Sequence, residues 1–325
     1  MIDDVYDFGL DHIIDTIRRR RAETIGLQFP DGFKRKAIKV LEEIEERTGS
    51  RVIISANSCF GACDIDTSLL ESVDLLFQFG HAEIPNIQTK NVIFVEAESS
   101  IDLLPVLTKA VRVVGDRVGL VSTAQFVHKL LDVKRYLADH GIQSVISSGD
   151  ARIAHPGLVL GCNFSAVPDC DEYLYIGTGD FHALGVSLAT NKPVWIADPE
   201  MNEIRKPDVD KVLRKRCAAI ERSLDAQSSF GILVSTKIGQ CRKDLAFELR
   251  CKAEEHGLDA HVLFADMITP EALAPFRVDA FVNTACPRIA IDNTAVFPVP
   301  VLTPVEFEVV IGARKWEDLV FDEIP

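Results

Sequence analysis

The stretch Gly157-Leu-Val-Leu-Gly-Cys162-Asn-Phe-Ser165 predicts a short apolar strand that runs into Gly161 and places Cys162 at its carboxyl end. Two other stretches have the same form. They are Arg51-Val-Ile-Ile-Ser-Ala-Asn-Ser-Cys59 and Val278-Asp-Ala-Phe-Val-Asn-Thr-Ala-Cys286. We interpret the rest of the chain as the scaffold that brings these three thiols together.

Working outward from these strands, a unit of strand, turn and helix occurs three times. The first strand of each unit begins near Ile25, Val118 and Ile232, and we expect the following helices to run to about Arg47, His140 and His256. A glycine follows each helix, at positions 49, 141 and 257, as is typical of a helix C-terminus. The long spacing between copies favours three small domains over a solenoid.

Each helix leads to three further predicted strands. The second strands are Val52–Ser55, Leu158–Leu160 (after a shorter Val145–Ser147) and Ala260–Phe264; the third are Leu75–Phe79, Tyr173–Ile176 and Ala280–Val282; the fourth are Val92–Val95, Val194–Ala197 and Val299–Leu302. Strands that alternate with helices predict parallel sheets with right-handed crossovers. The expected fold class is therefore α/β, with three homologous four-stranded, mainly parallel sheets flanked by helices in a pseudo-threefold arrangement.

The predicted domains are 1–112, which includes an N-terminal amphipathic helix, 113–226, and 227–325 with a C-terminal tail. In the 325 residues, 47% are hydrophobic and 26% charged, which indicates a globular chain with a substantial core. The formal charge of −14 argues against non-specific binding of nucleic acid, which needs basic surface. The chain has no apolar run long enough to span a membrane, and the acidic start Met1–Val5 differs from a signal peptide, so we expect a cytoplasmic protein.

Open parallel sheets bind ligands beyond the carboxyl ends of their strands. Cys59 and Cys162 follow second strands, whereas Cys286 follows a third strand. The equivalent third-strand loops of the other two domains contain His81 and His182, which either support the site or are ordinary loop residues. Each domain thus contributes one cysteine to this predicted binding edge.

Eight cysteines in a reducing compartment do not suggest a disulfide framework. Cys217, Cys241 and Cys251 lie in predicted helical stretches and are expected to be small buried residues. Thiolates suit zinc, copper(I) and iron–sulfur clusters, and three thiolates on a cubane leave one iron open for a substrate. Cys63 and Cys170 lie close enough to the same edge that spacing alone leaves their roles open.

The chain resembles the archaeal diphthamide synthase subunit 2 family, the 2-(3-amino-3-carboxypropyl)histidine synthases, over essentially its whole length. The resemblance rests on ordered motifs rather than on one short pattern. They are Gln28-Phe-Pro-Asp-Gly32, Cys59-Phe-Gly-Ala-Cys-Asp64, Phe79-Gly-His-Ala-Glu83, Leu160-Gly-Cys-Asn-Phe-Ser165, Phe181-His-Ala-Leu-Gly-Val186, Val234-Ser-Thr-Lys-Ile-Gly-Gln240, Asn283-Thr-Ala-Cys-Pro-Arg-Ile-Ala290 and Leu302-Thr-Pro-Val-Glu-Phe307.

The resemblance implies three homologous domains and one [4Fe-4S] cluster held by Cys59, Cys162 and Cys286. Cys63 is the alternative to Cys59, which we favour because it lies nearer the strand end. The implied activity is transfer of the 3-amino-3-carboxypropyl group of S-adenosylmethionine to C2 of a histidine on translation elongation factor 2. The reduced cluster is expected to cleave the sulfonium bond to the γ-carbon and so produce methylthioadenosine and a carbon radical. A homodimer and an electron donor are the further implied partners.

S-adenosylmethionine also needs groups that bind its methionine carboxylate. Loop amides and helix N-termini are suitable, and the candidates are Asp31, Gly32, Ser235, Lys237 and Gln240. Capping of the following helices is an equally good explanation of these residue types.

Three other functions compete with this one. A quinolinate-synthase-like dehydratase would use the open iron as a Lewis acid, without electron transfer. A non-catalytic partner subunit of a diphthamide synthase or a zinc-stabilised binding protein are alternatives that do not catalyse the reaction.

Overall fold

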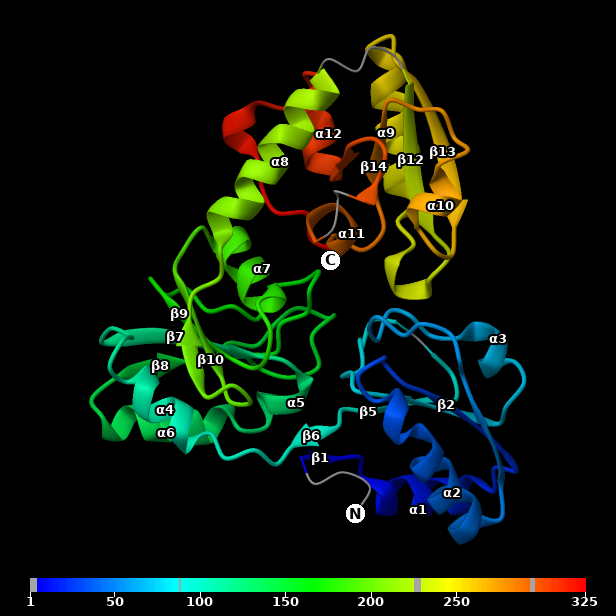
Figure 1. Cartoon of the computed structure of the whole chain (residues 1–325), viewed down its shortest axis with the longest axis vertical. Coiled ribbons are helices and arrows are strands. Elements are labelled where there is room, and N and C mark those ends of the chain that lie inside the picture. The colour runs from blue at the N-terminus through cyan, green and yellow to red at the C-terminus, as the bar shows by residue number, and fades with distance from the viewer. Residues whose placement is uncertain (1–4, 88, 225–228, 293–295) are drawn as a thin grey trace. The chain divides into compact units, whose positions relative to one another are not determined.

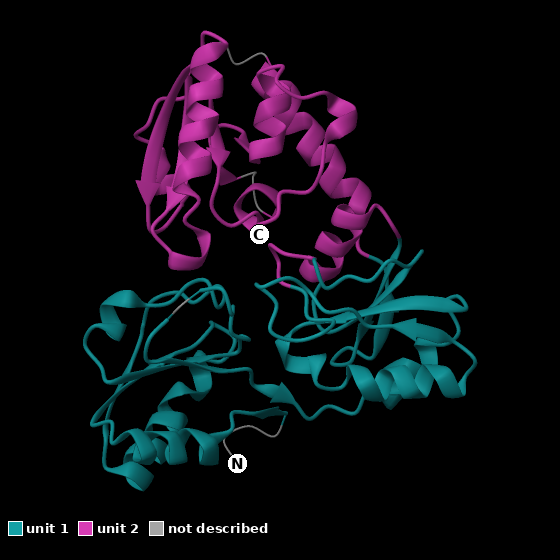
Figure 2. Ribbon diagram, turned by 180° about the vertical axis from the view of Figure 1, so that it is seen from behind, with its two compact units in different colours: residues 1–159, 165–179, 193–206 teal, residues 160–164, 180–192, 207–325 magenta. Residues whose placement is uncertain are grey.

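The computed structural model describes residues 5–87, 89–224, 229–292 and 296–325 (Figure 1). The chain forms two compact units, which Figure 2 distinguishes by colour. Unit 1 contains residues 1–159, 165–179 and 193–206, and unit 2 contains residues 160–164, 180–192 and 207–325. The short segment around Cys162 thus belongs to unit 2, whereas the residues on either side of it belong to unit 1.

Three parallel sheets share one strand order. In each, the first strand lies between the second and the third, and the fourth follows the third: β3-β2-β4-β5, β8-β7-β9-β10 and β13-β12-β14-β15. The strands are β2 (Thr24–Gln28), β3 (Arg51–Ile54), β4 (Leu75–Phe79), β5 (Val92–Val95), β7 (Arg117–Ser122), β8 (Gln143–Val145), β9 (Tyr173–Ile176), β10 (Val194–Asp198), β12 (Ser229–Ser235), β13 (Asp259–Ala265), β14 (Ala280–Asn283) and β15 (Val301–Leu302). The common order confirms the predicted threefold repeat of the sheet topology.

Helices connect these strands, and Figure 1 shows them along the sheets. The helices are α1 (Leu10–Arg20), η1 (Lys34–Lys36), α2 (Ala37–Thr48), α3 (Thr67–Leu70), α4 (Leu104–Ala110), α5 (Ala124–Val127), α6 (Leu130–Asp139), α7 (Phe181–Thr190), α8 (Val209–Leu224), η2 (Ile238–Gln240), α9 (Lys243–Glu255), α10 (Pro270–Leu273), α11 (Arg288–Ile291), α12 (Pro304–Val310) and η4 (Trp316–Asp318). Gly49, Gly141 and Gly257 follow α2, α6 and α9 with φ between 72° and 78°. The predicted left-handed helix ends are confirmed.

Apolar strand faces and helix stripes form the cores. In unit 1, α1 buries Ile13 and Ile17 beside the first sheet, in a cluster that includes Leu27, Phe77 and Val40 of α2. In unit 2, residues of α8, α9 and α12 pack on β12 and β14 in the same way. The predicted N-terminal amphipathic helix is confirmed, while Met1–Asp4 lie outside the described residues.

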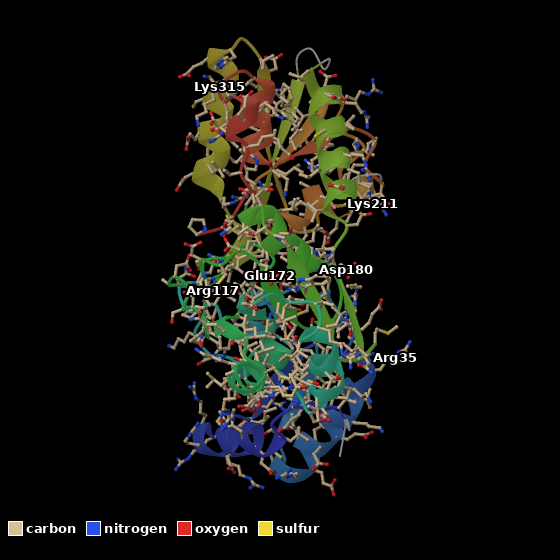
Figure 3. All side chains as sticks on the ribbon, turned by 90° about the vertical axis from the view of Figure 1, so that its left-hand side faces the viewer. Arg35, Arg117, Glu172, Asp180, Lys211 and Lys315 are labelled. Atoms are coloured by element: carbon tan, nitrogen blue, oxygen red, sulfur yellow. The ribbon has the colours of Figure 1, made fainter. Side chains whose placement is uncertain are left out.

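One predicted strand is wrong. Leu158–Leu160 is not a strand, because Leu158 forms only an isolated bridge to Ser122 at the end of β7. Earlier in β7, residues 117–119 pair with β8, which ends at Val145. The polar run 147–150 follows the end of β8, so the second strand does not continue there. The chain returns to β7 only at Leu158. Figure 3 labels Arg117, which opens β7, and Glu172, which immediately precedes the neighbouring strand β9.

Two antiparallel additions were not predicted. β1 (Tyr6–Asp7) pairs with β6 (Glu98–Ser99), and β11 (Glu203–Arg205) extends the second sheet beyond β10. Both are shorter than the 4–8 residues from which an alternating pattern can be recognised. Among the described helices, none is both long and apolar enough to cross a membrane.

Candidate functional site: three cysteine loops at the ends of parallel strands

The first cysteine loop, Cys59–Asp64, follows β3 in unit 1 and is held by two glutamines. Gln28 and Gln78 are register partners on β2 and β4, and both side chains are buried. Gln28 Nε2 donates to the carbonyl of Asp64 at 2.8 Å, and Gln78 Nε2 donates to the carbonyls of Asp64 and Gly61 at 3.2 Å each. Since each glutamine is a polar residue in a buried strand, its evident task is to fix this loop.

A histidine accompanies the first thiol. Cys59 is buried, and its Sγ lies 3.9 Å from Nδ1 of His81, which follows β4 as the sequence predicted. Burial lowers the pKa of His81 to about 4, against a hydrogen bond with the backbone of Phe79 that raises it. The imidazole is therefore neutral at pH 7 and adds no positive charge beside Cys59.

The second cysteine loop, Leu160–Phe164, packs against the start of α7 in unit 2. A Cβ on Gly161 would lie only 2.2 Å from Cε1 of Phe181, and a Cβ on Gly185 would lie 2.3 Å from Cζ of Phe164. The guanidinium of Arg288 lies over the Phe181 ring, at 4.0 Å from its centroid. Glycine at position 161 is thus required by close packing beside Cys162, which is itself buried.

The third cysteine loop, Asn283–Cys286, begins at the last residue of β14 in unit 2. Asn283 Nδ2 donates to the carbonyl of Cys286 at 2.9 Å, and Asn283 Oδ1 accepts from the amide of Ala285 at 3.2 Å. Thr284 Oγ1 donates to the carbonyl of Leu233 on the adjacent strand β12 at 2.7 Å. Buried Asn283 and Thr284 therefore fix the backbone that carries half-buried Cys286.

Arg288 links the second and third loops within unit 2. It lies two residues after Cys286, at the start of α11, and stacks on the ring that covers Gly161. Within unit 2, Arg288 therefore connects the residue packed on Gly161 with the helix that follows Cys286.

Three of the proposed carboxylate-binding residues lie together at the end of β12 and in the turn that follows it. Ser235 is buried and accepts a hydrogen bond from the amide of Lys237 at 3.1 Å. The Lys237 side chain is 10% exposed, and its Nζ lies 3.7 Å from Asp266. Gln240 is buried at the end of η2. This loop supplies a largely buried cation with hydroxyl and amide neighbours, a chemistry that suits a carboxylate.

The other two candidates lie in unit 1 and are more exposed. Asp31 pairs with Lys34 at 2.8 Å, and its side chain is 80% exposed. A Cβ on Gly32 would meet no atom within 4 Å, so close packing does not require a glycine there. The ion pair with Lys34, at the start of η1, is a sufficient structural explanation of an aspartate at position 31.

The remaining cysteines differ from the prediction. Cys241 and Cys251 are exposed and Cys217 is half-buried, so the expectation that these three are buried is wrong for the first two. Cys170 is 1% exposed, and Cys63 is half-buried in the first cysteine loop. None of the eight is in a disulfide in the structure. Across the described ranges, no group of three or more His, Cys, Asp and Glu side chains is arranged to hold a single metal ion.

These features define a class of protein: three copies of a parallel α/β sheet in one chain, with one cysteine loop in the sequence of each copy. The sequence model of a family described as "Putative diphthamide synthesis protein" matches residues 29–320. The chain belongs to this diphthamide synthesis family.

Individual relatives agree with this assignment. A 2-(3-amino-3-carboxypropyl)histidine synthase of Pyrococcus horikoshii is 32% identical over 98% of this chain and 94% of its own length. One from Methanocaldococcus jannaschii is 28% identical over 96% of this chain and 90% of its own length. The crystal structure of Dph2 from Pyrococcus horikoshii with a 4Fe-4S cluster matches with a TM-score of 0.90 and 31% identity, over 98% of this chain and 94% of that one.

Several residues that build the loops were not among the predicted site residues. Gln78, Arg242, Phe181 and Asp322 each contact a cysteine loop or hold a residue that does. Gln78 had a recognisable signal, because it is a polar residue inside the apolar run Leu75–Phe79. The other three had none, because their contacts join segments that are far apart in sequence.

Proposed function

We propose that this chain transfers the 3-amino-3-carboxypropyl group of S-adenosylmethionine to C2 of a histidine on elongation factor 2, the first step of diphthamide synthesis. One observation carries the proposal: the chain matches a named synthase over nearly the full length of both proteins. The three cysteine loops lie within that match. A binding module that had kept only the fold would not need a thiol in each repeat.

We assign Cys59, Cys162 and Cys286 as ligands of one [4Fe-4S] cluster. The donor set fits this group, because iron–sulfur clusters are held by thiolates and the sequence of each repeat contributes one of these cysteines in a loop. The Pyrococcus relative was crystallised with a 4Fe-4S cluster, which supports the same group here. When bound and reduced, the cluster would supply one electron to the sulfonium, which releases methylthioadenosine and the aminocarboxypropyl radical.

The protein groups would bind and orient the S-adenosylmethionine. Lys237, with Ser235 and Gln240 nearby, would bind the methionine carboxylate, because a cation in a largely desolvated loop makes a strong charge-assisted hydrogen bond. Asp31 and Gly32 remain candidates for a further contact to the same substrate. Asp31 would make that contact from an exposed position, where it is paired with Lys34.

The proposed partners follow from the chemistry. The acceptor histidine is on elongation factor 2, so the reaction takes place where translation does, in the cytoplasm. An electron donor must reduce the cluster before each turnover. One chain carries all three cysteines, which supports a self-sufficient homodimer over a non-catalytic partner subunit.

The test is a turnover assay with the purified full-length chain under anaerobic conditions. The cluster-loaded, reduced protein is mixed with S-adenosylmethionine and the elongation factor 2 of the same organism. We expect release of methylthioadenosine and a mass gain of one aminocarboxypropyl group on one histidine. Release of 5′-deoxyadenosine instead, or turnover that does not depend on the reductant, would refute the reaction.

Matched variants identify the site in the same assay. Cys286→Ala should abolish product, whereas Cys251→Ala, on an exposed position of α9, should behave as wild type. Lys237→Met should raise the KM for S-adenosylmethionine and leave the iron content unchanged. An unchanged KM would remove Lys237 from the binding site without affecting the cluster assignment.

A further inference from the structure

The segment Phe321–Ile324, which we call the clasp, runs along the second cysteine loop in unit 2. The Ile324 amide donates to the carbonyl of Cys162 itself at 2.8 Å. Asn163 Nδ2 donates in return to the carbonyl of Ile324 at 3.2 Å. The clasp is thus hydrogen-bonded to the residue that carries the thiol and to the next residue along the chain.

Two more contacts extend this pairing. The Phe164 amide donates to Oε2 of Glu323 at 2.7 Å, and the ring of Phe164 meets that of Phe321 edge to face at 5.3 Å between centroids. These contacts are significant because the second cysteine loop is outside any regular strand. Leu160 and Asn163 form only an isolated bridge to each other. The clasp therefore supplies hydrogen bonds that a sheet would otherwise provide.

Arg242 connects the clasp to the third cysteine loop. Its Nε donates to the carbonyl of Thr284 at 2.6 Å and its Nη2 to the carbonyl of Ala285 at 3.2 Å, the two residues before Cys286. The same guanidinium donates to both carboxylate oxygens of Asp322, at 2.7 and 2.6 Å. One side chain thus holds both the backbone beside Cys286 and the segment that holds Cys162.

The geometry of this pair makes it rigid. A bidentate arginine–carboxylate pair fixes both planes and not only a distance. The side chains of Arg242 and Asp322 are only 12% and 6% exposed, so water and salt screen the pair weakly. Arg242 Nη1 also lies 3.4 Å from the carbonyl of Glu323, which adds a further contact to the clasp.

We propose that Arg242 and Asp322 are positioning residues that, through the clasp, set the separation and orientation of Cys162 and Cys286 for the cluster. The inference rests on the proposed function, since it takes these two cysteines as cluster ligands. A cubane has fixed iron–sulfur geometry, so ligands held in place before assembly bind it with less loss of loop entropy. Without the clasp the thiols would still be present, but their backbone would be mobile.

Two variants test the clasp. Arg242→Met keeps the length of the side chain and removes its donors, and Asp322→Asn keeps the shape and removes the charge. The matched control is Arg314→Met, because Arg314 also pairs with a carboxylate in unit 2, Glu308 at 2.8 Å, and its guanidinium bonds the carbonyl of Asp318 rather than the backbone beside a cysteine. Arg242→Lys keeps the charge and loses the bidentate geometry, and should give an intermediate result.

The first readout uses the cluster-free, full-length protein. Hydrogen exchange of the Phe164 and Ile324 amides should become about tenfold faster in Arg242→Met and Asp322→Asn, while the strand amides of β12 keep their protection. Arg314→Met should match wild type at both amides. Equal exchange in all three variants would overturn the clasp, whether or not the cysteines bind iron.

The second readout uses the cluster-loaded protein. We expect about tenfold faster loss of iron to a chelator and a shifted electron paramagnetic resonance spectrum of the reduced cluster in the two clasp variants, with Arg314→Met unchanged. A general loss of stability would not shift the spectrum of the cluster that remains. An unchanged spectrum and unchanged iron loss would refute the positioning role. If Cys162→Ala and Cys286→Ala retain the cluster, the proposed function fails instead, and the exchange experiment still tests the clasp.

Discussion

Gly161 lies under the ring of Phe181, directly before Cys162, and the contact is close enough to yield a sharp prediction. A methyl group at position 161 would lie 2.2 Å from Cε1 and 2.8 Å from Cζ of that ring. Ordinary carbon contacts begin near 3.5 Å, so the ring would have to move by more than about 1 Å. Arg288 stacks on the same ring at 4.0 Å from its centroid, which restricts that movement.

We expect Gly161→Ala to destabilise unit 2 by about 1–3 kcal/mol, the usual cost of overpacking a well-packed site. The free energy of unfolding is measured in urea on the cluster-free protein, to separate packing from metal binding. Phe181→Leu in the same chain should recover part of the loss, because the smaller side chain makes room for the methyl group. The coupling energy of this double-mutant cycle should exceed about 0.5 kcal/mol.

The control is Gly32→Ala, where a Cβ would meet no atom within 4 Å. We expect its free energy of unfolding to equal that of wild type within about 0.5 kcal/mol. The reasoning is refuted if Gly161→Ala is as stable as this control, or if Phe181→Leu adds its own cost without relieving that of the alanine.

Three further predictions concern other contacts. Gln28→Leu should remove one donor to the Asp64 carbonyl and the side-chain acceptor of the Asp66 amide, cost about 1–3 kcal/mol in urea unfolding and lower iron retention; equal iron retention would contradict its role. Arg216→Met should cost about 3–5 kcal/mol because it leaves the buried Glu306 carboxylate without its partner, and adding Glu306→Gln should recover part of the loss if that charge is the cause. A hydrogen bond to Glu96 raises the pKa of His155, so this pair stabilises the fold fully below the unfolded value of about 6.5 and loses its effect as pH rises through the higher folded pKa. His155→Gln should therefore lower the free energy of urea unfolding more at about pH 5.5 than at about pH 8.5, by less than about 1 kcal/mol since the pair is partly exposed, and an equal loss at both pH values would contradict this.

The repeat was predictable because the strands that define it are apolar runs with clear ends. The run Leu75–Phe79 is bounded by the polar Asp74 and by Gly80, and the structure gives β4 the predicted limits. The second strand of the second copy failed for the opposite reason. Its apolar residues are split by a polar insertion, so that Leu158 reaches the sheet only at a single bridge. The hydrophobic pattern of a sequence predicts a continuous strand. It does not predict a strand that leaves the sheet and returns to it later in the chain.

The burial of Cys251 was wrongly predicted because its position around the helix was not considered. In α9 the buried residues are Ala246, Leu249 and Ala253, and Cys251 lies two positions from Leu249, about 200° around the helix. The spacing of the apolar residues in the sequence already placed Cys251 on the opposite face of the helix. Cys241 is different, because it follows η2 and is not part of the helix at all.

The positions of Cys59 and Cys286 beyond strands could be predicted, whereas the strand predicted before Cys162 is absent and the contacts that fix the loops could not be predicted. Arg242 and Asp322 are separated by 80 residues and the pair has no local pattern. Two buried residues at and after the end of β12, Ser235 and Gln240, were predicted as binding residues from their type and position alone. Local chemistry thus identified loops, while pairing between distant segments required the structure.

The most direct test of the central claim is the iron content of single cysteine variants after anaerobic reconstitution. We predict that Cys59→Ala, Cys162→Ala and Cys286→Ala each lose the signal of the reduced cluster and most of the bound iron. Cys63→Ala and Cys170→Ala should retain both. A full complement of iron in any of the first three, or loss of the cluster in Cys63→Ala with retention in Cys59→Ala, would contradict the assignment of one cluster ligand to each repeat.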